Sequence, residues 1–235
     1  MALIAGRFST ESDQGKRMST VTENISAAQV KDLREKTGAP MMDCRSALME
    51  AKGNVEEAIV VLRKKGMASA AKKATRNTSE GAVGTYIHAG GKIGVLLEIN
   101  CESDFVARTE DFQELLKDIA MHIAATDPRY IRLEDVTKED LAREQDIYRA
   151  QAAATGKPAA VIEKIVEGKM SKFYEEVCLL EQPFIKEQSV TIKELIGQKV
   201  GKLGENMTVR RFARFKVGDA GYTVAQIKPS AVEHE

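Results

Sequence analysis

The chain has 235 residues, of which 43% are hydrophobic and 30% charged, with 35 basic side chains against 35 acidic ones. This composition is typical of a soluble cytosolic protein with one large domain or two small ones. The absence of net positive charge argues against a nucleic-acid binder, and no apolar run reaches the roughly 20 residues that span a bilayer.

Residues 1–23 open the chain with a very short apolar stretch followed by polar sequence. The segment lacks the apolar core of a signal peptide, and Glu11 and Asp13 argue against an organelle transit peptide. Its composition predicts a disordered extension.

Residues 24–66 are expected to form a compact bundle of three short helices. The first helix, "SAAQVKDLREKTG", closes at the turn before Pro40. In the second, apolar residues recur at helical spacing: Cys44, Ala47, Leu48 and Ala51. The third follows an Asn54 cap and is predicted to stop at Gly66. Residues 67–80 then form a helical linker that frays.

In the next segment, residues 81–218, apolar residues first alternate with other residues at every second position. Alternating runs on both sides of Gly90-Gly91 predict a hairpin over residues 82–100, and a third strand is expected at 208–217. Three helices are expected between these strands, from Phe112 to Asp127, from Thr137 to about Ala153 and from Pro158 to about Leu180. The fold class is therefore α+β, with a small three-stranded antiparallel sheet packed by helices, and residues 219–235 form a C-terminal tail.

Sequence motifs for bound cofactors and for catalysis are missing. The stretches "GGKIGVLLE" and "GQKVGKLGE" both fail the spacing of the GxxxxGK[ST] phosphate loop. His88, His122 and His234 are scattered, so we expect structural or solvated roles and no metal. The three cysteines form neither a disulfide framework nor a CxxC pair, and Cys101 has no histidine nearby in sequence. We expect no cofactor and no enzymatic reaction.

Residues 210–215, "RRFARF", interleave aromatics with arginine as single-strand binders do. In a strand, however, Phe212 shares a face with Arg210 and Arg214, while Phe215 lies on the opposite face. One aromatic can then pack inward while the basic side chains reach solvent. We prefer this packing interpretation and expect no direct contact with nucleic acid.

Two other stretches leave a structural and a functional interpretation open. In "TGAPMMDC", only one of two adjacent methionines can easily enter a small core, and the other is left to solvent or a partner. Alternatively, both are partly core. In "SDFVAR", Asp104 can cap a helix while Phe105 returns to the core, or the pair can be presented to a partner.

Four stretches closely resemble bacterial-type translation elongation factor Ts: "LREKTGAPMMDCRSALMEAKGNVEEAIVVLRKKG", "GVLLEINCESDFVART", "EKIVEGKMSKFYEEVCLLEQPFI" and "GENMTVRRFARF". The resemblance runs in order over about residues 24–218. It implies a guanine-nucleotide exchange factor for elongation factor Tu in the bacterial cytoplasm rather than an organelle matrix. It also implies a ubiquitin-associated-like N-terminal bundle that binds the partner's G domain, and a core for exchange and dimerisation.

Site residues follow from the same resemblance. It implies that Asp104 and Phe105, flanked by Ser103 and Val106 in the [ST]DFV motif, reach near the partner's magnesium and phosphate site. Ser103 stands where many family members have Thr.

The resemblance also assigns a contact to the N-terminal bundle and suggests an assembly. Arg34, Met41 and Met42 match the family's contact with the same G domain. The single core resembles the short form of the family, which pairs as a homodimer. The alternatives are an adaptor for ubiquitin-like partners, an RNA-binding protein, and a monomer whose helices from 112 to 180 cover the second sheet face.

Overall fold

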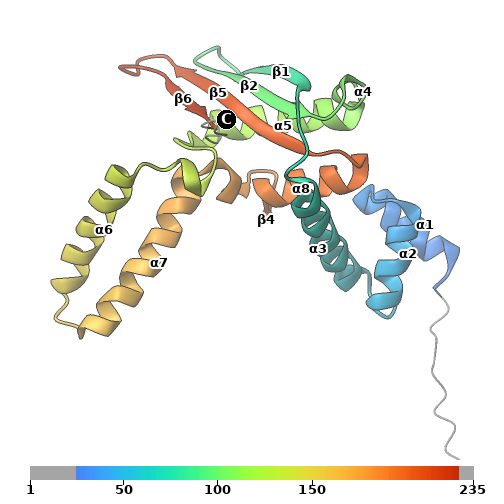
Figure 1. The fold of residues 1–235 in the computed structure, drawn as a ribbon, viewed down its shortest axis with the longest axis horizontal. Coiled ribbons are helices and arrows are strands. Elements are labelled where there is room, and N and C mark those ends of the chain that lie inside the picture. Colours follow the sequence, from blue (N-terminus) through green and yellow to red (C-terminus); the bar gives the residue numbers. More distant parts are fainter. Residues whose placement is uncertain (1–24, 228–235) are drawn as a thin grey trace, which may run out of the picture.

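The computed structural model describes residues 25–227 (Figure 1). The predicted disordered extension, residues 1–23, and His234 lie outside the described residues. The α-helices are α1 (Ala27–Thr37), α2 (Met41–Glu50), α3 (Val55–Lys73), α4 (Asp104–Ala107), α5 (Glu110–Thr126), α6 (Lys138–Ala153), α7 (Ala159–Val177) and α8 (Ile192–Leu203). The strands are β1 (Glu80–Ile87), β2 (Ile93–Cys101), β3 (Pro183–Phe184), β4 (Glu187–Thr191), β5 (Met207–Lys216) and β6 (Thr223–Gln226).

Helices α1, α2 and the first part of α3 form the predicted N-terminal bundle. Ser26 and Gln29 make a reciprocal capping box at the start of α1, and Gly38, with a φ of 66°, ends that helix. The bundle encloses its own small core, formed by Val30, Leu33, Cys44, Ala47, Leu48, Ala51 and Ala58. The three helices are therefore confirmed, and their likeness to a ubiquitin-associated domain stays a prediction.

Helix α3 does not stop at Gly66, so the predicted helix end is wrong. The helix continues to Lys73, through much of the predicted linker, and crosses α8. A methyl group on Gly66 would lie 3.1 Å from the backbone oxygen of Gly197 in α8. Gly66 is thus a close-packing residue inside a helix, where sequence alone suggested a helix end.

The main sheet has the strand order β1-β2-β5-β6, with antiparallel neighbours throughout. The predicted hairpin and late strand are confirmed, but the predicted count of three strands is wrong. Strand β6 lies within residues 219–235, the predicted tail, and pairs with Arg211–Arg214 of β5. Four residues are too few to show a clear alternating pattern in the sequence, so this strand is recognised only from its pairing with β5 in the structure.

A bulge interrupts β5 at Arg210. Ile99 pairs with Val209 while Glu98 pairs with Arg211, which leaves Arg210 as the extra residue. As a result Val209, Phe212 and Arg214 all point inward, although strict alternation would place Val209 on the face of Phe215. The predicted inward packing of one aromatic is confirmed, since Phe212 is buried and Phe215 is exposed.

Helix α5 packs on the inner face of the sheet, and α8 packs against α3 and α5 (Figure 1). The main core combines the inward residues of β2, β5 and α5, among them Leu97, Phe112 and Val209. Helices α6 and α7 form a separate hairpin with its own small core around Phe173, and this hairpin projects away from the sheet (Figure 1). These two helices are confirmed at nearly their predicted bounds.

Candidate functional site

The candidate site begins at the corner where β2 ends and α4 begins. Ser103 is the N-cap of α4, and its hydroxyl accepts a hydrogen bond from the Val106 backbone NH at 3.4 Å. The same hydroxyl donates to the Glu205 carboxylate at 2.6 Å, and the Ser103 backbone NH donates to the other Glu205 oxygen at 3.0 Å. Glu205 thus ties this corner to the chain just before β5.

Helix α4 buries one side and presents the other to solvent. Val106 and Ala107 are buried in the main core, whereas the Phe105 side chain is 77% exposed. The interpretation in which Asp104 caps the helix and Phe105 returns to the core is therefore wrong, because Ser103 provides the cap. The exposed Asp104 carboxylate accepts a hydrogen bond from Arg108 at 2.5 Å.

The predicted site residue Val106 has a different place from its neighbours. It is 6% exposed and so cannot offer an extended contact surface. Its side chain instead anchors the short helix to the core. Burial of Val106 next to an exposed Phe105 holds the aromatic ring away from its own protein's core.

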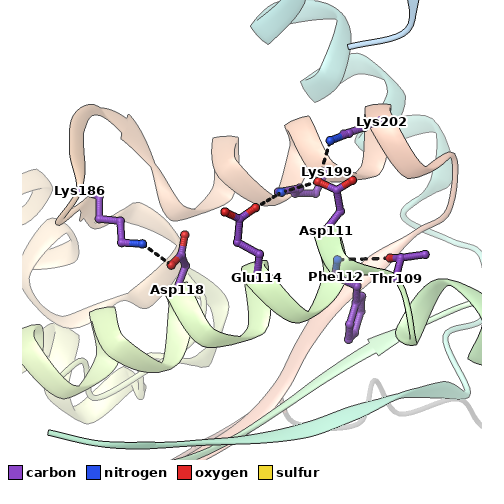
Figure 2. Close-up of polar contacts among 8 residues, drawn as sticks. All are labelled: Thr109, Asp111, Phe112, Glu114, Asp118, Lys186, Lys199 and Lys202. Carbon is purple, nitrogen blue, oxygen red and sulfur yellow. Dashed lines mark hydrogen bonds and ion pairs between the residues drawn. The ribbon is translucent and has the colours of Figure 1, made fainter. Parts of the chain in front are cut away.

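Helix α5 continues directly from this corner and gives it a firm base. Thr109 caps α5 by accepting a hydrogen bond from the Phe112 NH, and the Phe112 side chain is fully buried (Figure 2). The Gln113 amide also donates to the Ala107 backbone oxygen at 2.7 Å, which closes the end of α4. The exposed ring of Phe105 therefore projects from backbone that is hydrogen-bonded at both ends.

A ladder of ion pairs joins α5 to α8 and to the loop before β4 behind this corner (Figure 2). Asp111 accepts hydrogen bonds from Lys199 at 2.9 Å and from Lys202 at 2.7 Å. Lys199 also donates to Glu114 at 3.0 Å. Further along, Lys186 pairs with Asp118 at 2.6 Å.

The charges of the ladder hold each other in the ionised form. Burial alone would raise the pKa of Asp111, but the hydrogen bonds from Lys202 and Lys199 lower it below its usual value. Burial would likewise lower the pKa of Lys199, yet the carboxylates of Asp111 and Glu114 raise it. Sequence reasoning missed this ladder because its partners are far apart in the chain; only the helical spacing of the acids within α5 was visible.

Arg34, Met41 and Met42 lie on the surface of the N-terminal bundle. Met41 is 44% and Met42 72% exposed, so neither enters the small core, and the expectation that one would do so is wrong. Both occupy the first turn of α2, whereas the buried positions begin at Cys44. In Figure 1, α4 and the pair α1–α2 lie toward the same end of the molecule, opposite the α6–α7 hairpin.

Two buried titratable side chains of the main domain, His122 and Cys101, have structural partners. The His122 Nε2 atom lies 2.9 Å from the Gln182 side-chain oxygen, and the Ile185 NH donates to His122 Nδ1 at 3.4 Å. Burial lowers the pKa of His122 and so favours the neutral ring. Cys101 donates to the Ser103 backbone oxygen, and burial raises the pKa of its thiol.

Residues 25–227 contain no group of three or more His, Cys, Asp or Glu side chains that could hold a metal ion. None of the helices in this part of the chain is long and apolar enough to cross a membrane.

Comparison with known proteins gave a consistent result along nearly the whole chain. The family model described as "Elongation factor TS" matches residues 11–219. An elongation factor Ts from Koribacter versatilis is 73% identical over 207 residues, which cover 88% of this chain and 94% of that protein. The elongation factor Ts of Solibacter usitatus is 63% identical and that of Geobacter sulfurreducens 58%, each over 196 residues, with 83% of this chain and 92% and 91% of those proteins covered.

Proposed function

Because the chain belongs to the elongation factor Ts family, we propose that it is a guanine-nucleotide exchange factor for elongation factor Tu in translation elongation. The observation that carries the proposal is the exposed Phe105 ring beside Asp104 on a tightly anchored corner. An aromatic side chain left in water at 77% exposure contributes little to the fold and is well suited to a partner's pocket. The bacterial relatives favour the bacterial cytoplasm as its location.

In the proposed mechanism, Phe105 enters the G domain of elongation factor Tu near the magnesium and phosphate site. GDP is held there by phosphate contacts and the metal ion, so moving the elements that support either one weakens binding. Asp104 supplies a carboxylate that can redirect hydrogen bonds at the same place. The hydrogen bond from Arg108 orients this carboxylate. Ser103 and Val106 act by fixing α4, through Glu205 and the core respectively.

No covalent bond changes in this reaction, so the protein acts through binding energy alone and is not an enzyme in the chemical sense. By thermodynamic linkage, a factor that weakens GDP binding is itself bound less tightly when GDP is present. Rebinding of a nucleotide, mostly GTP in the cell, then releases the factor.

A second contact surface is assigned to the N-terminal bundle. We define the methionine surface as Met41, Met42 and the neighbouring Arg34, all exposed. Methionine adapts its shape to a partner, and Arg adds a charged contact. This surface anchors the complex, while the α4 corner disturbs the nucleotide site.

The geometry gives little support to the RNA-binding alternative. Phe212 is buried, and the Arg214 guanidinium, also buried, donates to the Ala124 backbone oxygen and pairs with Asp127 at 3.0 Å. Phe212 is therefore part of the core and Arg214 closes the end of α5, which leaves "RRFARF" without its interleaved surface. The adaptor alternative has no specific observation in its favour.

We further propose that the protein pairs as a homodimer through the outer face of its sheet. This face carries exposed apolar side chains from all four strands and their connections: Val83, Ile87, Leu96, Phe215, Val217, Tyr222 and Val224. Helix α5 packs on the opposite face. Contiguous exposed apolar surface of this kind typically marks an interface, and a two-fold axis would pair the patch with itself.

A stopped-flow measurement of labelled GDP leaving elongation factor Tu tests the exchange function. Addition of this protein at substoichiometric concentration should speed the release many-fold. An adaptor or an RNA-binding protein would leave the release rate unchanged at any concentration, and that result would overturn the proposal.

A further inference from the structure

We propose that Gly66 and Lys202 are positioning residues that hold the methionine surface at a fixed place relative to the α4 corner. The inference rests on the proposed function, since it explains how two separate surfaces reach a single partner. It assigns to the junction of α3 with α8 a role in affinity as well as in folding.

Helix α3 crosses α8 closely at Gly66, where no side chain separates the two backbones, while the neighbouring Met67 side chain packs against Gly197. A methyl group on Gly66 would lie 3.1 Å from the Gly197 oxygen and 3.4 Å from the Gln198 Cα atom. From the other side, a methyl group on Gly201 would lie 3.4 Å from the Gly66 Cα atom. A side chain at Gly66 would have to push the two helices apart, so the close approach leaves α3 little freedom to tilt.

Polar contacts fix α3 on the same side of the junction. The Arg63 guanidinium donates to the Glu187 carboxylate at 2.6 Å and to the Ser189 backbone oxygen at 3.2 Å. Both acceptors belong to β4, which precedes α8. Because Arg63 lies about one helical turn before Gly66, the polar and the glycine contacts together oppose rotation of α3 about its axis.

Lys202 links the bundle to the base of the α4 corner. Its ammonium group donates to Asp111 in the first turn of α5 at 2.7 Å. A methyl group on Gly38, at the turn between α1 and α2, would lie 2.9 Å from the same nitrogen atom. One side chain of α8 therefore touches both the turn that leads into Met41 and the helix that follows Phe105.

Two linked contact surfaces bind a partner more tightly than either surface alone, provided that their spacing matches the partner. A stiff connection adds further affinity, because less freedom is lost on binding. The junction of α3 with α8 supplies that stiffness. Lys202 adds a contact between the two surfaces, because it bonds Asp111 and lies against Gly38.

Distance measurement between two spin labels tests the rigidity directly. The three native cysteines are buried, so labels can be attached at Glu35→Cys in α1 and Lys117→Cys in α5, both exposed positions. The matched pair of variants is Gly66→Leu and Gly168→Leu, because a side chain at Gly168 in α7 meets nothing within 4 Å.

Gly66→Leu should shift the label distance by about 1–2 Å or broaden its distribution, since helix pairs separate by that amount as their contact residues grow. Gly168→Leu should leave the distribution unchanged. An unaltered distribution in folded Gly66→Leu would overturn the proposal. If that variant does not fold, Lys202→Met is used, with Lys193→Met on the same helix as its control; Lys193 pairs only weakly with Glu181, at 3.9 Å.

Binding to elongation factor Tu provides the functional arm. Gly66→Leu should weaken the complex about tenfold or more, because the two surfaces no longer act together. In a Met41→Ala/Met42→Ala background the same substitution should have almost no further effect, a non-additivity that general destabilisation does not produce. Full additivity would overturn the inference. Failure of the wild type to speed GDP release would instead refute the proposed function and leave the distance result standing.

Discussion

Two phenylalanines seven positions apart show how differently neighbouring residues of this chain are used. Phe105 lies in a four-residue helix with its ring in solvent, and Phe112 lies in the next helix with its ring fully buried. The difference depends on Val106 and Ala107, which take the inward side of α4. Removal of the two rings should therefore change the free energy of unfolding by different amounts.

Phe105→Ala should slow GDP release from elongation factor Tu while changing the free energy of unfolding by no more than about 0.5 kcal/mol, as for other surface substitutions. Phe112→Ala is the matched control and should lose about 3–5 kcal/mol, because it leaves a cavity in the core. Exchange kinetics and urea titrations measure the two effects. A core-sized loss of stability in Phe105→Ala would contradict the assignment.

His122 should make the stability of the protein depend on pH. Burial lowers its pKa in the folded state, so the unfolded chain binds a proton first as the pH falls through about 6.5. Stability is then full above that pH and decreases below it, by up to about 1.4 kcal/mol per pH unit, until the folded pKa is reached.

Urea titrations of His122→Gln between pH 7.5 and 5.5 isolate this effect. The variant should lose less stability than the wild type over that range, because it has no imidazole that must stay neutral in the folded state. His88→Gln, at an exposed position, should follow the wild type. Identical pH dependence in wild type and His122→Gln would mean that folding does not lower the pKa of His122, and would contradict the prediction.

At the scale of elements, α5 and α8 are held together by charge as well as by apolar packing. Lys199 is the most enclosed lysine of the ladder, with a side chain only 16% exposed, and it depends on Asp111 and Glu114 for its partners. At the other end, Lys186 is 53% exposed and has a single partner in the ladder, Asp118. The two ends should therefore differ in energy.

Asp111→Asn should lower the free energy of unfolding by about 1–3 kcal/mol, since Lys199 and Lys202 both lose a charged acceptor. Because its pKa is lowered in the folded protein, the Asp111 contribution is present at neutral pH and disappears as the pH falls through that lowered value. Asp118→Asn should cost less than Asp111→Asn, because it removes a single ion pair whose lysine is half exposed. Equal losses of unfolding free energy in the two variants would contradict the predicted difference between the two ends of the ladder.

The first turn of α2 exposes Met41 and Met42, and we propose that it serves binding instead of packing. Met41→Ala with Met42→Ala should weaken complex formation with elongation factor Tu, because the methionine surface is lost, yet leave the exchange rate at saturating protein nearly unchanged. Met49→Ala, also exposed on α2, provides the control. Titration calorimetry measures the affinity and stopped flow the rate; unchanged affinity in the double variant would contradict the anchoring role.

At the scale of the whole molecule, the sheet is packed by helix on one face and carries apolar side chains on the other. Light scattering across a dilution series should show about twice the 25.8 kDa chain mass at micromolar concentration. Phe215→Lys should shift the protein toward the monomer, because a charge enters the middle of the patch. Ile147→Lys, an exposed apolar position on α6, should not. A wild type that keeps the monomer mass at high micromolar concentration would rule out the dimer.

Local patterns in the sequence already determined most of the elements and marked the Asp104-Phe105 pair. Helical spacing around Cys44, Phe112 and Phe173 and the glycines of the β1–β2 turn specify structure over short distances, where side-chain periodicity decides. The "SDFV" motif marked the candidate site, although its sequence left open whether Phe105 was buried.

Tertiary structure decided what depends on contacts between distant segments. Strand β6 forms by pairing with β5, and the bulge at Arg210 turns Val209 inward. Helix α3 continues through Gly66, where it packs closely against α8. Glu205 fixes the corner beneath Phe105 from about 100 residues away in the chain. The local sequence pattern limits the conformations that a residue can adopt. The energy of contacts with distant segments decides which of these conformations the folded protein has.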